Sequence, residues 1–191
     1  MDRILNALIA VLSPLALAVA CRENGAFSGA KLKQAFRYFT VQSNVLCSAA
    51  ALLLCLFPAV RWIWALKFVG TAAVTVTMLT VLIFLGPQYG YKALLSGPDL
   101  VMHLITPLLA LGSFCLLERR GLGFPLLLTG LLPVALYGVL YLYKVLLAPE
   151  PKRWEDFYGF NKGGKWYLSF PIMLAAALLI SLALSAIQSL A

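Results

Sequence analysis

The residues of this chain best suited to chemistry are one threonine and one histidine, each near the start of a long apolar segment. Thr40 lies in the sequence RYFTVQSN (37–44), and His103, the only histidine, lies in DLVMHLITP (99–107). A threonine hydroxyl becomes nucleophilic when a base removes its proton, and neutral imidazole is a common base. An ionisable side chain inside a membrane segment is a functional candidate, because its insertion costs about 2–3 kcal/mol. The pair therefore predicts nucleophilic catalysis by a hydroxyl.

His103 shares one helical face with an acidic side chain and a hydroxyl. Asp99 precedes it by four residues and Thr106 follows it by three, which places all three on one side of a helix. We expect Asp99 to orient the imidazole and stabilise its protonated form, as the acid does in a Ser-His-Asp triad. Thr106 is expected to contact substrate. The alternative role for Asp99 is a helix cap at the start of the apolar segment.

Thr40 also has polar neighbours on its helical face. Ser43 and Asn44 follow it by three and four residues, and we expect both to bind substrate, either one donating to an oxyanion. If the two helices begin four to five residues earlier, Thr40 and His103 lie roughly 5–8 Å below the same interface, given the 1.5 Å rise per residue. They meet if these helices pack together. The competing interpretation is that the same groups only hold helices together, at about 0.6 kcal/mol per hydrogen bond.

The elements that would position these residues are transmembrane helices. Of the 191 residues, 62% are hydrophobic and 12% charged, and the mean hydropathy is +0.93. A span needs roughly 20 apolar residues, and continuously apolar runs predict helices rather than a barrel. We therefore predict an all-α bundle of six transmembrane helices that forms a single domain over 1–191, in an integral, multi-pass membrane protein. The predicted spans are 4–21, 38–57, 62–85, 99–117, 124–147 and 166–189.

The net charge of +8 indicates contact with lipid head groups rather than with nucleic acid, because the basic residues flank the spans. Of the 15 Lys and Arg residues, ten flank the first, third and fifth loops. The other five flank the opposite face, which carries both termini: Arg3, Arg61, Lys67, Arg119 and Arg120. The positive-inside rule then predicts that the odd-numbered loops are cytoplasmic.

No cofactor or metal site is predicted. The four cysteines are scattered without CxxC spacing and are accompanied by a single histidine, too few ligands for a zinc site. The chain also contains no Walker-type glycine loop, HExxH or GxSxG motif.

The fifth loop is rich in aromatic residues, among them Trp154 and Tyr158. Such residues suit a membrane interface, and the loop is either an interfacial anchor or a lid over a site on the same face. Tyr137 and Tyr141 share a face of the fifth span and approach this loop. We expect Tyr137, Tyr141, Trp154 and Tyr158 to contribute to substrate binding.

The motifs around Thr40 and His103 resemble those of a bacterial six-span branch of the androgen-induced membrane protein family. Animal members are intramembrane threonine hydrolases that cleave fatty acid esters of hydroxy fatty acids. The resemblance implies that Thr40 is the nucleophile and His103 the base. It also implies a bacterial cell membrane as the location, and cytoplasmic termini, opposite to the orientation that the charges favour. The last loop departs from the family's aromatic-proline motif, with WEDFYGF at 154–160.

The preferred function is an intramembrane lipid-ester hydrolase whose partner is a membrane lipid or fatty acid ester. The alternative is a non-catalytic protein for lipid binding or small-solute transport, with the same residues lining its pocket. A hydroxyl-to-imidazole distance of about 3 Å would favour the enzyme, and side chains on opposite sides of the bundle would exclude it. The oligomeric state is left open.

Overall fold

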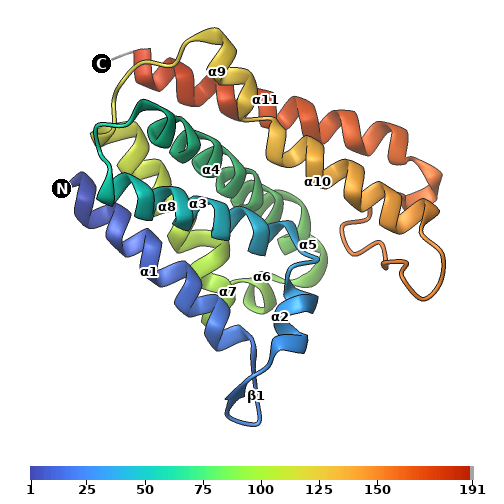
Figure 1. Cartoon of the computed structure of the whole chain (residues 1–191). Helices are drawn as coiled ribbons and strands as arrows, with labels where there is room; N and C mark the ends of the chain where they lie inside the picture. The colour runs from blue at the N-terminus through green and yellow to red at the C-terminus, as the bar shows by residue number, and fades with distance from the viewer. Residues whose placement is uncertain (190–191) are drawn as a thin grey trace.

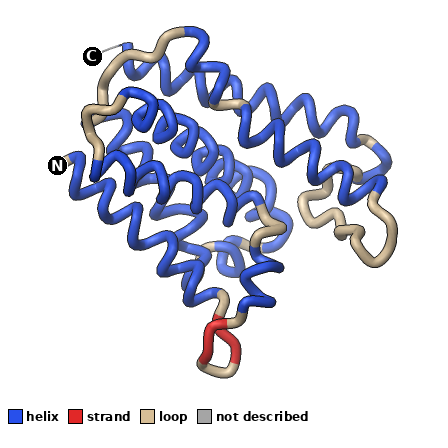
Figure 2. The backbone as a smooth tube through the Cα atoms, viewed as in Figure 1, coloured by secondary structure: helices blue, strands red, loops and turns tan. Residues whose placement is uncertain are grey.

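The structure, a computed structural model that describes residues 1–189, is almost entirely helical (Figure 1 and Figure 2). In the described part of the chain, six helical stretches are long and apolar enough to cross a membrane: Asp2–Ala20, Phe39–Leu56, Arg61–Tyr89, Gly97–Leu117, Phe124–Leu147 and Trp166–Ser189. These stretches confirm the predicted all-α, six-span bundle. The largest difference is in the third span, which continues to Tyr89 instead of ending near residue 85.

Several spans consist of consecutive shorter helices. In chain order the elements are α1 (Asp2–Ala20), β1 (Arg22–Glu23), β2 (Ala26–Phe27), α2 (Gly29–Ala35), α3 (Phe39–Leu56), α4 (Arg61–Thr80), η1 (Val81–Leu85), α5 (Gly86–Tyr89), α6 (Tyr91–Leu94), α7 (Gly97–Leu100), η2 (Val101–Ile105), α8 (Thr106–Gly112), η3 (Ser113–Leu117), α9 (Phe124–Thr129), α10 (Leu132–Leu142), η4 (Tyr143–Leu147), η5 (Lys162–Gly164) and α11 (Trp166–Ser189). The elements η1 to η4 are π-helical turns. In η2 the cause is visible: Pro107 has no N–H to donate to the carbonyl of His103, four residues earlier. The turn that carries His103 is therefore wider than an α-helical turn.

The helix α3 lies between α1 and α4 and contacts both of them. The fourth span contacts the same two helices through α8. The helices α9, α10 and α11 lie along one edge of the bundle, where α11 contacts both α4 and α10 (Figure 1). This packing brings the start of α3 to the same end of the bundle as the start of the fourth span.

The helices α3 and α4 approach closely at Gly70. A β-carbon at this position would lie 2.8 Å from the Cα atom of Cys47, which the backbone could accommodate only by shifting. Small residues allow this kind of close backbone contact between membrane helices. Gly70 therefore helps to fix how α3, and with it Thr40, is seated on α4.

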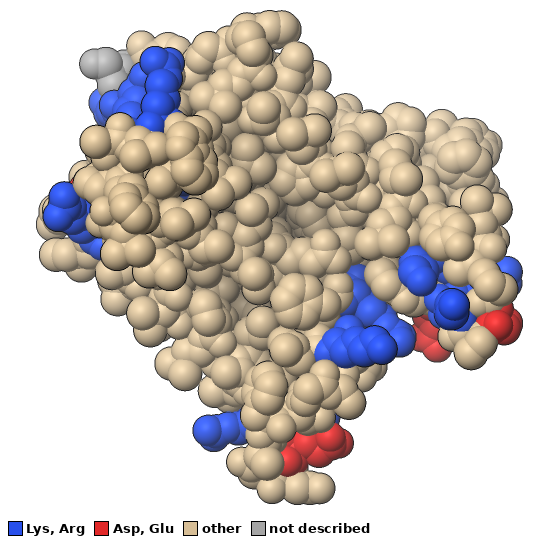
Figure 3. All heavy atoms as spheres, viewed as in Figure 1, with Lys and Arg blue, Asp and Glu red and all other residues tan. Residues whose placement is uncertain are grey.

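The surface fits a lipid environment. Large apolar side chains point outward along the spans, for example Leu52, Leu136 and Ile172, each more than half exposed. On the face shown in Figure 3, charged atoms lie toward the two ends of the bundle and the surface between them is uncharged. This distribution is typical of an integral membrane protein.

The first loop folds into a small hairpin followed by the interfacial helix α2. The strands β1 and β2 pair antiparallel, and the turn between them is Asn24-Gly25, with φ angles of 50° and 82°. Asn-Gly is the preferred sequence for such a turn, because both positions require positive φ. Ser28 accepts a hydrogen bond from the N–H of Lys31 and caps α2.

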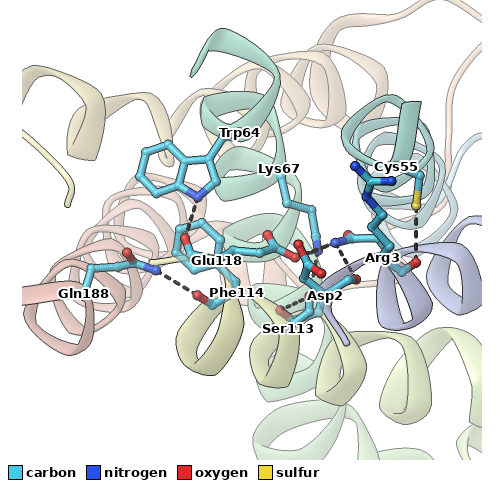
Figure 4. A network of polar contacts seen from close by, with 11 residues as sticks. Asp2, Arg3, Cys55, Trp64, Lys67, Ser113, Phe114, Glu118 and Gln188 are labelled. Atoms are coloured by element: carbon cyan, nitrogen blue, oxygen red, sulfur yellow. Dashed lines mark hydrogen bonds and ion pairs between the residues drawn. The ribbon is translucent and has the colours of Figure 1, made fainter. Parts of the chain in front are cut away.

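At the end of the bundle that holds the termini, a buried ion pair joins α1, α4 and η3 (Figure 4). The Nζ atom of Lys67 donates to Asn6 Oδ1 at 2.6 Å, Ser113 Oγ at 2.8 Å and Glu118 Oε1 at 3.2 Å. Both charged side chains are buried. Counting Lys67 among the loop-flanking charges was therefore wrong, because it lies inside the protein and is neutralised there. Four basic residues remain on this face against ten on the other.

Candidate active site

The hydroxyl of Thr40 and the imidazole of His103 are in contact. The distance from Thr40 Oγ1 to His103 Nε2 is 3.2 Å. Thr40 lies in the first turn of α3, and His103 lies in η2, where it is buried. The distance agrees with the value of about 3 Å expected for a nucleophile and its base.

The tautomer of His103 follows from its second hydrogen bond. Its Nδ1 atom is 2.7 Å from the carbonyl oxygen of Leu94, the last residue of α6. A carbonyl oxygen only accepts hydrogen bonds, so Nδ1 carries the proton and donates it. In the neutral imidazole the Nε2 atom is then unprotonated, and its lone pair faces the hydroxyl of Thr40. This is the arrangement that a general base requires.

The orienting role expected for Asp99 belongs instead to a backbone carbonyl. Asp99 lies in the first turn of α7 and lines the same cavity as His103. Within residues 1–189, however, it makes no hydrogen bond or ion pair to the imidazole, and Leu94 occupies the Nδ1 side. The short helix α6 folds back toward η2 and brings this carbonyl into place. Asp99 lies in the first turn of α7, where an acidic side chain is favourable, but no side-chain hydrogen bond from the described residues caps this helix.

Asn44 holds the two halves of the pair together. Its Nδ2 donates to the carbonyl of Thr40 at 2.8 Å and to the carbonyl of Met102 at 3.0 Å. Its Oδ1 accepts from the hydroxyl of Ser13 in α1 at 3.1 Å. Both amide hydrogens are therefore committed to backbone groups. In this structure Asn44 ties α3 to η2 and offers no free donor to an oxyanion.

Ser43 and Thr106, both expected to bind substrate, lie among groups of the helix bundle. Ser43 Oγ donates to the carbonyl of Thr40 at 3.1 Å and lies 2.9 Å from the hydroxyl of Thr77 in α4. Thr106 is fully buried, its hydroxyl has no hydrogen-bond partner in the described part of the chain, and it lines neither cavity described below. The structure therefore separates Thr106 from the Thr40–His103 contact.

Two cavities meet at Thr40. The apolar cavity is small, with a volume of about 40 Å³, and lies between α4, α10 and α11, with Val76, Val134, Phe170 and Met173 in its wall. The histidine cavity has a volume of about 340 Å³ and is lined by His103 and Asp99. Three residues line both cavities: Thr40, Leu85 and Tyr158.

The fifth loop reaches the site through Tyr158. The backbone N–H of Phe39, the first residue of α3, donates to Tyr158 Oη at 3.0 Å. Tyr141 keeps the loop in this position: its hydroxyl accepts from the N–H of Tyr158 at 3.0 Å and donates to Asp156 Oδ1 at 2.9 Å. Asp156 in turn accepts from the N–H of Phe160 at 2.9 Å. The loop thus covers the start of α3 as a lid would.

The remaining predicted aromatic residues take different positions. Tyr137 lines the apolar cavity, and its hydroxyl donates to the carbonyl of Arg37 at 2.8 Å. Tyr141 lines neither cavity and acts on the loop instead. Trp154 also lies outside both cavities, and its ring is 5.9 Å from the ammonium group of Lys144. Of the two predicted aromatic residues in the loop, only Tyr158 therefore lines the cavities.

Burial raises the pKa of the Tyr158 phenol to about 12, although hydrogen bonds from Phe39, Tyr137 and Thr40 act in the opposite direction. The phenol is therefore neutral at physiological pH and retains its proton as a hydrogen-bond donor.

No group of three or more His, Cys, Asp or Glu side chains that could hold a metal ion occurs within residues 1–189.

The sequence motifs thus identified a threonine and a histidine that the fold brings together, whereas the carbonyl of Leu94 carries no signal in the sequence.

Comparisons of this chain with protein-family models, with curated proteins and with solved structures found no match.

Proposed function

We propose that this protein is an intramembrane hydrolase of lipid esters, with Thr40 as nucleophile and His103 as general base. The observation that carries the proposal is the pair of contacts at the imidazole. Nδ1 is fixed by the carbonyl of Leu94, and Nε2 lies 3.2 Å from Thr40 Oγ1. A hydrogen bond that merely joined two helices would not require two cavities to meet at the hydroxyl.

The reaction follows from these positions. His103 Nε2 removes the proton of Thr40 as Oγ1 bonds to the ester carbonyl carbon, whose oxygen becomes an oxyanion. When this intermediate collapses, the bond to the alcohol oxygen breaks and His103 gives its proton to that oxygen. Water, deprotonated by the same nitrogen, then attacks the acyl-threonine. The bond to Oγ1 breaks, Oγ1 regains a proton, and the carboxylic acid leaves.

The two cavities suggest how the ester lies in the site. The group that protonates the leaving alcohol must face it, and His103 lines only the histidine cavity. The alcohol part therefore occupies the histidine cavity. The acyl chain occupies the apolar cavity, whose wall includes Val76, Val134 and Met173. The apolar wall suits the chain of an ester dissolved in the bilayer, because the chain is kept out of water in both places.

Covalent labelling with a fluorophosphonate probe tests the proposal on the purified full chain in nanodiscs. Labelling should be lost in Thr40→Ala and reduced on the order of 10²-fold or more in His103→Ala, from the contribution of a general base. Thr129→Ala is the matched control, because Thr129 lies in α9 and bonds to its own helix through the carbonyl of Leu126. It should label like the wild type.

Two outcomes would contradict the proposal. Equal labelling of wild type and Thr40→Ala would remove Thr40 as the nucleophile. An unlabelled wild type that is well folded and binds a fatty acid ester without cleaving it would indicate the lipid-binding alternative, in which the same hydrogen bonds serve only packing.

A further inference from the structure

The proposed reaction produces a negative charge on the former carbonyl oxygen, and such an oxyanion needs hydrogen-bond donors. The two side chains expected to provide them are used elsewhere. Asn44 donates both amide hydrogens to backbone carbonyls, and Ser43 donates to the carbonyl of Thr40. The donor must therefore come from another residue at the junction of the two cavities.

Tyr158 is the polar side chain that meets this requirement. Together with Thr40 and Leu85 it lines both cavities, so its hydroxyl end borders the place where an ester carbonyl would join an acyl chain to an alcohol. Leu85 carries no polar side-chain group, and Thr40 is the nucleophile itself.

The hydrogen bonds of Tyr158 place its hydroxyl beside the reacting group. The hydroxyl accepts a hydrogen bond from the N–H of Phe39 at 3.0 Å. The neighbouring hydroxyl of Tyr137 directs its own proton to the carbonyl of Arg37. The side chains of Tyr137 and Thr40 also hydrogen-bond with the Tyr158 hydroxyl, so the phenol adjoins the reacting hydroxyl of Thr40. An accepted hydrogen bond also polarises the O–H group and strengthens its donation.

The position of Tyr158 relative to α3 adds to this effect. Phe39 and Thr40 are the first two residues of a helix of 18 residues. The N-terminal end of a helix carries a partial positive charge, which stabilises a nearby anion. An oxygen bound by Tyr158 beside Thr40 would lie at this end. The phenol also remains protonated across the neutral pH range, as its raised pKa requires.

We propose that the Tyr158 hydroxyl donates a hydrogen bond to the oxyanion formed when Thr40 attacks an ester carbonyl. Tyr158 is then a catalytic residue delivered by the fifth loop, and the loop completes the active site as well as covering it. This inference rests on the proposed hydrolase function.

The test is the hydrolysis of p-nitrophenyl butyrate by the full chain in nanodiscs, with wild type and Tyr158→Phe compared. Removal of one oxyanion donor should lower kcat on the order of 10²- to 10³-fold, with a much smaller change in KM. Tyr143→Phe is the matched control: Tyr143 lies in η4, is exposed and lines neither cavity, so its kcat should not change.

A second variant separates catalysis from loop anchoring. Tyr141→Phe removes the hydroxyl that bonds to Asp156 and to the N–H of Tyr158, but Tyr141 does not reach the cavities. If Tyr158 served only to hold the loop, both variants would show the same loss. The proposal requires a clearly larger loss of kcat in Tyr158→Phe than in Tyr141→Phe.

A trifluoromethyl ketone provides a readout that does not depend on turnover, because it forms an oxyanion on the nucleophile. Its inhibition constant should rise in Tyr158→Phe by about the same factor by which kcat/KM falls. A kcat in Tyr158→Phe close to that of the wild type, or an unchanged inhibition constant, would overturn the role of Tyr158 alone. Turnover that persists in Thr40→Ala would instead overturn Thr40 as the nucleophile, and no turnover in a well-folded wild type would overturn the hydrolase proposal itself.

Discussion

Replacing Lys67 by methionine should destabilise the protein strongly. The ammonium group is fully buried and has three hydrogen-bond acceptors, on α1, on η3 and on Glu118 just after it. The Oε2 atom of Glu118 has no partner in the described part of the chain, and its Oε1 also accepts from Asn6 Nδ2 at 2.6 Å. Without Lys67, the carboxylate would remain in the bundle with no compensating charge.

The expected magnitude follows from the burial of this pair. Removing one partner of a buried ion pair costs about 3–5 kcal/mol, because the other charge is left unpaired. For a chain of 191 residues, 1 kcal/mol corresponds to about 2–4 °C in Tm. Lys67→Met should therefore lower Tm by on the order of 6–20 °C. The double variant Lys67→Met/Glu118→Gln carries neither charge and should recover at least half of this loss.

Thermal unfolding can be followed with a thiol-reactive fluorogenic maleimide in detergent micelles. Cys47 is fully buried in α3 and becomes reactive only when the bundle opens. Lys152→Met provides the control, because Lys152 lies exposed in the fifth loop. A Tm for Lys67→Met within about 2 °C of the wild type, below the range expected for an unpaired buried charge, would refute the reasoning. So would a double variant as unstable as the single one.

Two further predictions concern the site and its support. Asp99→Asn should change kcat for ester hydrolysis by less than about tenfold, because the carbonyl of Leu94 fixes the imidazole. Loss of an acid that orients the imidazole costs on the order of 10⁴-fold in kcat. A loss of that size in Asp99→Asn would show that Asp99 orients His103 after all. Gly70→Ala should lower stability by about 1–3 kcal/mol, because its β-carbon would meet the backbone of Cys47. Gly112→Ala, where the added carbon has no neighbour within 4 Å, should leave Tm near the wild-type value in the same maleimide assay, and equal effects of the two glycine variants would contradict this account.

The sequence predicted the spans well because each one is a continuous apolar run, and such a run has few alternatives to a transmembrane helix. It also placed Thr40 and His103 at similar depths in helices that run in the same direction, so that the two residues meet if those helices pack together. Depth alone did not establish which helices are neighbours. That depends on the packing of α3 and η2, which Asn44 bridges through the carbonyl of Met102.

The orientation of His103 could not be predicted in the same way. Its Nδ1 partner is a backbone carbonyl, and every residue has one, so Leu94 is indistinguishable from its neighbours in the sequence. Asp99 was the more prominent candidate because its side chain is charged. The wider turn in η2 and the short helix α6 decide the partner, and both are products of the fold.

Lys67 was misassigned for a related reason. A lysine one to two turns inside a span either extends its ammonium group to the interface or pairs within the bundle, and hydropathy does not separate the two. Its partner Glu118 is 51 residues away in the chain. In contrast, the turn Asn24-Gly25 has a local signature, because both positions require a positive φ that few residue pairs adopt.

The two polar clusters of the bundle allow helix packing to be distinguished from a functional site. The groups around Lys67 and Asn6 bond to one another, with only Glu118 Oε2 left without a partner in the described part of the chain, and they border none of the cavities described here. Thr40 and His103 are also hydrogen-bonded, but one hydroxyl lines two cavities and one imidazole nitrogen faces that hydroxyl as an acceptor. Polar groups that only hold helices together gain nothing from adjacent empty space, because unfilled volume in a core is destabilising. The space beside Thr40 therefore favours a site that receives a ligand over a contact that serves packing alone.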